Sequence, residues 1–168
     1  MNMQQGEQEQ MEEDMKALRQ LLENLVTLSF DQEQLIADVG KTAVTAPRYV
    51  KLVQEQKKIQ DDFKLVEDSL QALSKRVIQI ETFVTEKVTE VKGHMGKSMT
   101  LLEDRQQSPA SAEQQFAMKN LNDLALMLSE VMNQMQQQMS SMMSGNQMCN
   151  NPGGQGQSGK VPKDKMSQ

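Results

Sequence analysis

The residues of this chain best suited to chemistry are methionines. Residues 132–143 read MNQMQQQMSSMM, and methionine occupies five of these twelve positions. The thioether of methionine is a soft ligand that suits Cu(I), so the segment could hold a soft metal. Methionine is also unbranched and adaptable, so the same segment could instead fill a helical core.

The spacing of these methionines favours packing over metal binding. Apolar residues recur at steps of three and four, which is the period of one face of a helix. The stripe consists of Met118, Leu121, Ala125, Leu128, Met132, Met135, Met139 and Met142. A copper site would favour nearby His or Cys, and only Cys149 is close in sequence. We therefore expect no metal ligand and no cofactor. The far end of this helix is either an adaptable partner-binding surface or a loosely packed core.

The other reactive residues lack the neighbours that catalysis needs. The sequence VGKT at 39–42 resembles a phosphate-binding loop, but Leu35 stands where the motif requires glycine, and GKS at 96–98 has Val91 there. His94 has no evident base or orienting partner in the sequence, and Cys149 is the only cysteine. We therefore expect no catalytic residue and no enzymatic activity.

The composition excludes several classes of partner. The net charge is −5, and the chain has no Trp, four Phe and one Tyr. Phosphate contacts need clustered Lys and Arg, and base stacking needs aromatic side chains, so nucleic acid is not an expected partner. The uncharged residues 131–159 are rich in Gln, Asn, Ser and Gly, so direct membrane insertion of this segment is not expected.

Helical periodicity predicts an all-α fold. We expect three long helices over about 7–39, 47–105 and 111–144, which pack as antiparallel hairpins or as a coiled-coil-like bundle. Together they form one domain, 7–145. Residues 1–6 are expected to be disordered, and the Gly-, Asn- and Gln-rich residues 146–168 to form a flexible linker.

A few residues mark where the predicted helices begin and end. Gly40 and Pro47 bound the first predicted loop, and Ser111 with Gln114 has the spacing of a capping box at the start of the last helix. Gly145 is a natural stop for that helix.

The middle helix has the strictest pattern in the chain. Its apolar residues alternate at four and three without a slip, and no proline interrupts residues 48–108. This favours an unbroken rod of roughly 85 Å. A break near 74–78, in a region rich in β-branched residues, would instead give a four-helix bundle. The stripe consists of Ile59, Phe63, Val66, Leu70, Leu73, Val77, Ile80 and Val84.

Three segments carry a family resemblance: LRQLLENLVTLSFDQEQLI, PRYVKLVQEQKKIQDDFKLVEDSLQALSKRV and QQFAMKNLNDLALMLSEVMNQMQQQM. They resemble the central helical, Gln- and Met-rich region of a family of large, uncharacterised bacterial envelope proteins with N-terminal membrane helices. The resemblance covers about residues 7–145. It implies a segment excised from a membrane-anchored parent, lying on the non-cytoplasmic side of a membrane. It implies no site residues.

These observations predict a non-catalytic helical scaffold or interaction segment. The alternatives are Cu(I) binding through the third helix, or a non-catalytic fragment of a larger enzyme. An unbroken middle helix would leave Phe63, Val66, Leu70 and Leu73 covered from one side only. On that basis we expect self-association, or docking on another segment of the parent protein.

Overall fold

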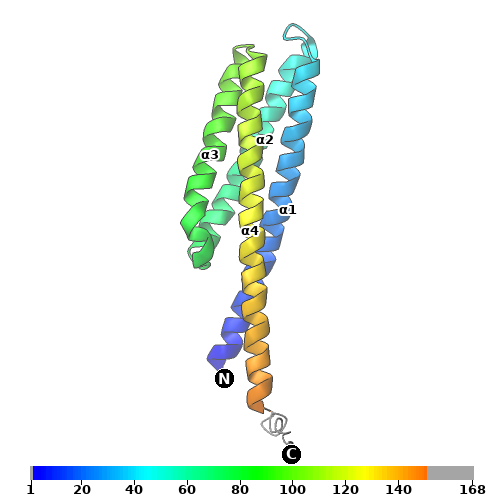
Figure 1. The fold of residues 1–168 in the computed structure, drawn as a ribbon. Coiled ribbons are helices and arrows are strands. Elements are labelled where there is room, and N and C mark those ends of the chain that lie inside the picture. Colours follow the sequence, from blue (N-terminus) through cyan, green and yellow to red (C-terminus); the bar gives the residue numbers. More distant parts are fainter. Residues whose placement is uncertain (1, 151–168) are drawn as a thin grey trace, which may run out of the picture.

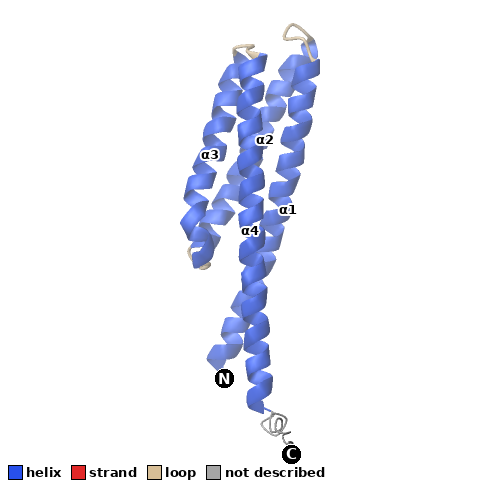
Figure 2. Ribbon diagram, viewed as in Figure 1, coloured by secondary structure: helices blue, strands red, loops and turns tan. Residues whose placement is uncertain are grey.

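Residues 2–150 form a bundle of four antiparallel helices. The computed structural model describes the backbone of residues 2–150 and the side chains of residues 5–144. This part of the chain forms α1 (Asn2–Lys41), α2 (Pro47–Ser74), α3 (Ile78–Glu103) and α4 (Gln107–Asn150), and contains no strand. Each helix packs against the next, and α4 closes the ring on α1 (Figure 1). Short loops join the helices (Figure 2). The predicted all-α fold is confirmed.

The preference for an unbroken middle helix is wrong, because the chain reverses between α2 and α3. Lys75 still has helical dihedral angles, whereas Val77 is extended, with φ −106° and ψ 95°. The backbone N–H groups of Arg76 and Val77 both donate to the carbonyl of Leu73, at 2.9 Å. These bonds satisfy the end of α2 and turn the chain. The alternative four-helix bundle is the one observed.

The apolar stripe could not reveal this reversal. Leu70, Leu73, Val77 and Ile80 keep their steps of three and four across the turn, and all are buried. Both helices of a hairpin direct their apolar stripes at the same core. A turn as short as this one therefore leaves the spacing of three and four between apolar residues unchanged. Phe63 and Val66 are buried as well. The reason for expecting self-association through this stripe is therefore removed.

The second helix begins at the predicted position, whereas the first begins earlier than predicted. Pro47 is the first residue of α2, where its missing N–H costs nothing, and Ala46 is the N-cap. α1 is longer than predicted and begins at Asn2, inside the segment expected to be disordered.

The last helix is longer than predicted at both ends. It begins at Gln107, so Ser111 lies inside α4 and makes no capping box with Gln114. Gly145 does not stop it, because the helical backbone continues to Asn150. Residues 151–168 of the predicted linker lie outside the described part of the chain.

Each helix contributes one stripe at steps of three and four to the core. In α4 the buried stripe is shifted around the helix from the predicted one. Methionines lie beside the buried residues with the same spacing of three and four, so the period alone could not identify which line faces the core. The predicted Met118, Ala125, Met132, Met139 and Met142 are only half-buried. The buried line of α4 consists of Ala110, Gln114, Ala117, Leu121, Leu124, Leu128, Val131 and Met135.

The end of the bundle that carries two loops is closed. The hydroxyl of buried Tyr49 donates to the carbonyl of Leu102 at 2.6 Å, and burial raises the pKa of this phenol, although nearby Arg105 opposes the shift. Arg105 has a positive φ of 60°, donates to the carbonyl of Val44, and lies 5.8 Å from the centre of the Tyr49 ring. The side-chain amide of Gln107 donates to the carbonyl of Val39 at 2.8 Å. These bonds tie both loops together.

Candidate partner-binding site

The opposite end of the bundle is open, because α1 and α4 run past the turn between α2 and α3 (Figure 1). Arg76 in that turn contacts Asp14, and Val77 lines a cavity with Met135. The turn therefore lies level with Asp14 on α1 and Met135 on α4. We call α1 residues 2–13 and α4 residues 136–150 the open end. At 1.5 Å per residue, they extend roughly 18 and 22 Å beyond the turn.

A cavity of ≈ 330 Å³ lies where the open end meets the bundle. Its apolar lining comes from α1, α4 and the turn, and half of its polar lining residues lie on α1. The lining residues are Glu7, Gln10, Met11, Asp14, Arg76, Val77, Gln79, Met135, Gln138 and Met142. The structure thus brings methionines from two helices to one concave surface. The sequence pattern identified the α4 methionines but gave no sign that Met11 faces them.

A charged pair fixes the base of this cavity. The side chain of Asp14 is 8% exposed, and its Oδ1 lies 3.1 Å from Nε of Arg76 and accepts a bond from the Gln10 amide at 3.0 Å. A nearly buried carboxylate is costly unless it is paired, so Arg76 anchors the turn to α1. Sequence reasoning missed this pair, because its members are separated by 62 residues.

A layer of glutamines crosses the core nearer the closed end. Gln32 and Gln56 exchange two amide hydrogen bonds, at 2.8 and 3.0 Å, and Gln114 donates to Oε1 of Gln56 at 2.9 Å. All three are fully buried, and so is Ser98, which donates to the carbonyl of Met95. Oε1 of Gln114 has no hydrogen-bond partner among the described residues. The signal in the sequence was a polar residue standing on the core line of each helix.

His94 lies between α3 and α4 and has partners that the sequence did not reveal. Its Nδ1 is 2.6 Å from Oε1 of Glu113, its Nε2 is 3.4 Å from Oε1 of Glu90, and its ring packs 5.1 Å from that of Phe116. No metal-binding group of three His, Cys, Asp or Glu side chains occurs among the described residues. The arrangement joins two helices. The side chain of Cys149 lies outside the described residues.

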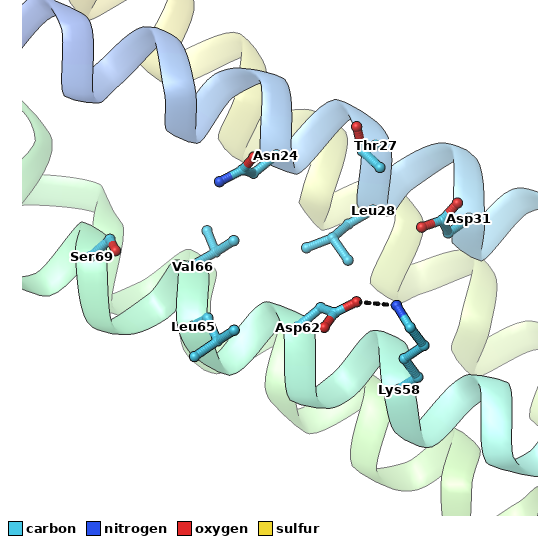
Figure 3. A pocket seen from close by; sticks show the side chains of 9 residues that line it. All are labelled: Asn24, Thr27, Leu28, Asp31, Lys58, Asp62, Leu65, Val66 and Ser69. Atoms are coloured by element: carbon cyan, nitrogen blue, oxygen red, sulfur yellow. Dashed lines mark hydrogen bonds and ion pairs between the residues drawn. The ribbon is translucent and has the colours of Figure 1, made fainter.

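A second groove runs between α1 and α2. Its volume is ≈ 360 Å³, and Figure 3 shows Leu28 and Val66 between the helices and an ion pair between Lys58 and Asp62. Leu65 at its edge is 67% exposed. The remaining lining residues are Asn24, Thr27, Asp31 and Ser69. A charged pair lies on its rim, and its lining is about as polar as it is apolar, whereas the lining of the cavity at the open end is mainly apolar. This groove is therefore a weaker candidate than the open end.

The two segments that resemble phosphate-binding loops are helical. Gly40 lies in the last turn of α1, and Gly96 lies in the middle of α3. A helical backbone directs its N–H groups along the helix axis and cannot wrap a phosphate as the glycine-rich loop does. Both segments therefore lack the loop that the phosphate-binding motif requires.

Comparison with family models, curated proteins and solved structures finds no match for this chain. The resemblance to bacterial envelope proteins therefore stays a prediction. Within the described residues, no helix is both long enough and apolar enough to span a membrane.

Proposed function

We propose that this chain is a non-catalytic helical interaction module whose open end docks another helix. The observation that carries the proposal is the extension of α1 and α4 beyond the α2–α3 turn, which leaves a methionine-lined cavity uncovered. Methionine side chains adapt to different apolar partners, so this surface suits docking. The closed end and the glutamine layer hold the four helices in register behind it.

The resemblance stated above extends this proposal to a setting. The module would belong to a larger membrane-anchored bacterial envelope protein and lie on the non-cytoplasmic side of the membrane. There it would act as a spacer or scaffold, and the docked helix would come from another segment of the parent protein or from a neighbouring protein.

Position-resolved crosslinking in the native cell tests the docking. A photo-crosslinking amino acid is placed at Gln138 or Met142 in the open end, and at Leu126, which is 70% exposed elsewhere on α4, as the control. We expect one defined helical segment to be crosslinked from 138 and 142 and not from 126. The proposal is wrong if the three positions give the same products, or if the open end gives none.

A second candidate function is soft-metal binding, because Met11, Met135 and Met142 line one cavity. Three thioethers are a donor set that suits Cu(I). Titration with Cu(I) against a strong competing chelator tests it. Stoichiometric binding that is abolished by Met11→Leu with Met142→Leu would establish a site, whereas binding that survives these changes would place the metal elsewhere.

A further inference from the structure

We infer that the helix docked at the open end is amphipathic, with an apolar stripe flanked by Lys and Arg. This inference rests on the proposed docking function and specifies the chemistry of the partner. A second copy of this chain is the main rival occupant, and the charge of the open end decides between the two.

The geometry gives the partner its size and its apolar stripe. In the body of the bundle each helix has two neighbours, but beyond the turn α1 and α4 have only each other. Two corners of the four-helix cross-section are vacant there. A helix of at least three turns would fill the roughly 18 Å that both overhangs share. Its apolar stripe would meet Met11, Met135 and Met142, which already line the cavity.

The charges on the two overhanging helices differ. On α1, Glu7 lines the cavity, while Glu9, Glu12 and Glu13 line the adjoining groove, where Lys16 is the one cation. None of these four carboxylates forms an ion pair within the described part of the chain. Asp14 is already paired with Arg76. On α4, residues 131–144 carry no charge.

An acidic α1 beside a neutral, methionine-rich α4 fits a basic amphipathic helix. Lys and Arg on the partner would face the carboxylates of α1, while its apolar stripe lies on the methionines of α4. A second copy would bring an identical acidic α1 to the same place, and like charges across an interface oppose association. The stripe that suggested a homodimer, which includes Phe63 and Leu70, is also buried within the single chain.

Methyl NMR with a synthetic peptide tests the inference. The full chain, labelled with ¹³C in its methionine methyl groups, is titrated with a helical Leu/Lys peptide of about five turns, and with a Leu/Glu peptide of the same apolar pattern as the control. We expect saturable shifts of the Met11, Met135, Met139 and Met142 signals with the basic peptide. The signals of Met95 and Met118, which lie in the body of the bundle, should not move.

Variants separate the contribution of charge from that of apolar contact. Glu7→Gln with Glu12→Gln should weaken binding about fivefold and flatten its salt dependence. Met139→Gln with Met142→Gln should weaken it at least about tenfold. Leu126→Gln, outside the open end, should leave it unchanged. Circular dichroism confirms that each variant keeps its helices.

Four results would overturn the inference. Equal binding of the acidic peptide would show that charge does not select the partner. Shifts spread over Met95 and Met118 would show that the open end is not the site. Concentration-dependent shifts of the open-end methyls without peptide, together with a dimer in sedimentation, would make a second copy the occupant. Crosslinking of a non-basic segment from position 142 would leave the docking function standing while refuting the chemistry inferred for its partner.

Discussion

At the scale of single residues, the buried amide groups of Gln32, Gln56 and Gln114 restrict how the helices can pack. Each is fully buried, and Gln56 accepts from both of the others. A buried amide is tolerated only when it is hydrogen-bonded, so the helices that carry these residues fit together in one register. Reversing the Gln114 amide would place its oxygen against Oε1 of Gln56, and two acceptors cannot form a hydrogen bond. The orientation of this amide is therefore fixed as well.

Gln56→Leu is expected to lower the free energy of unfolding by about 3 kcal/mol, because it leaves buried amide groups of Gln32 and Gln114 without partners. Urea denaturation followed by circular dichroism measures the change. Gln54→Leu, on the exposed face of the same helix, should change stability by less than about 0.5 kcal/mol. Equal effects of the two substitutions would show that the layer has no special role.

Replacing the whole layer is expected to have the opposite effect. With Gln32, Gln56 and Gln114 all changed to Leu, no amide is left unpaired, so stability should equal or exceed that of the natural chain. The cost should appear as loss of a single register, detected as broadened or doubled methyl signals in NMR spectra. A triple variant that is both less stable and uniquely folded would contradict this account of the layer.

The carboxylate of Asp123 gives the bundle a pH dependence. Its hydrogen bond and ion pair with Lys119, helped by Lys87 on α3, hold its pKa below the ordinary value of 3.8. Because the pKa is lower in the folded state, the ionised carboxylate stabilises the bundle fully at pH values above the ordinary pKa. This stabilisation is lost as the pH falls through the folded-state pKa. Lowering the pH from about 5 to about 2 should therefore destabilise the natural chain more than Asp123→Asn. Lys119→Gln should reduce this difference in acid destabilisation between chains with and without the Asp123 carboxylate. Identical pH profiles of stability for the natural chain and Asp123→Asn would refute the prediction.

At the scale of elements, the turn between α2 and α3 decides the architecture. Most of the fold follows from the sequence, since the helix period, Pro47 and the buried stripe of residues 59–84 are all visible in it. The reversal at 75–77 is not, because Leu73 and Val77 keep the helical period across it. The Asp14–Arg76 pair, the facing of Met11 toward α4 and the partners of His94 depend on tertiary packing, and no local pattern signals them.

Ile78→Pro tests the position of the reversal. Ile78 is the first residue of α3, is 72% exposed, and follows the extended Val77, so proline fits there as it does at any helix start. We expect a change in stability of less than about 1 kcal/mol. Glu86→Pro, in the interior of α3, should cost about 3 kcal/mol or more. Similar losses for both, measured by urea denaturation, would mean that residue 78 lies inside a continuous helix.

At the scale of the whole molecule, the bundle has one finished end and one unfinished end. Tyr49, Arg105 and Gln107 tie the loops of the closed end together, whereas α1 and α4 leave the opposite end as a two-helix extension. The glutamine layer keeps α1, α2 and α4 in register, and the methionines at the far end provide an adaptable surface. The proposed docking site exists only because the chain reverses at 75–77.

One distance therefore tests the account most directly. Spin labels at the exposed residues Lys51 on α2 and Lys97 on α3 are separated along the chain by most of both helices. In the bundle these positions lie on neighbouring antiparallel helices at similar levels, and a distance of less than about 30 Å between the labels is expected from double electron–electron resonance. A distance near about 70 Å, the length of a continuous helix between them, would contradict the bundle and with it the open end.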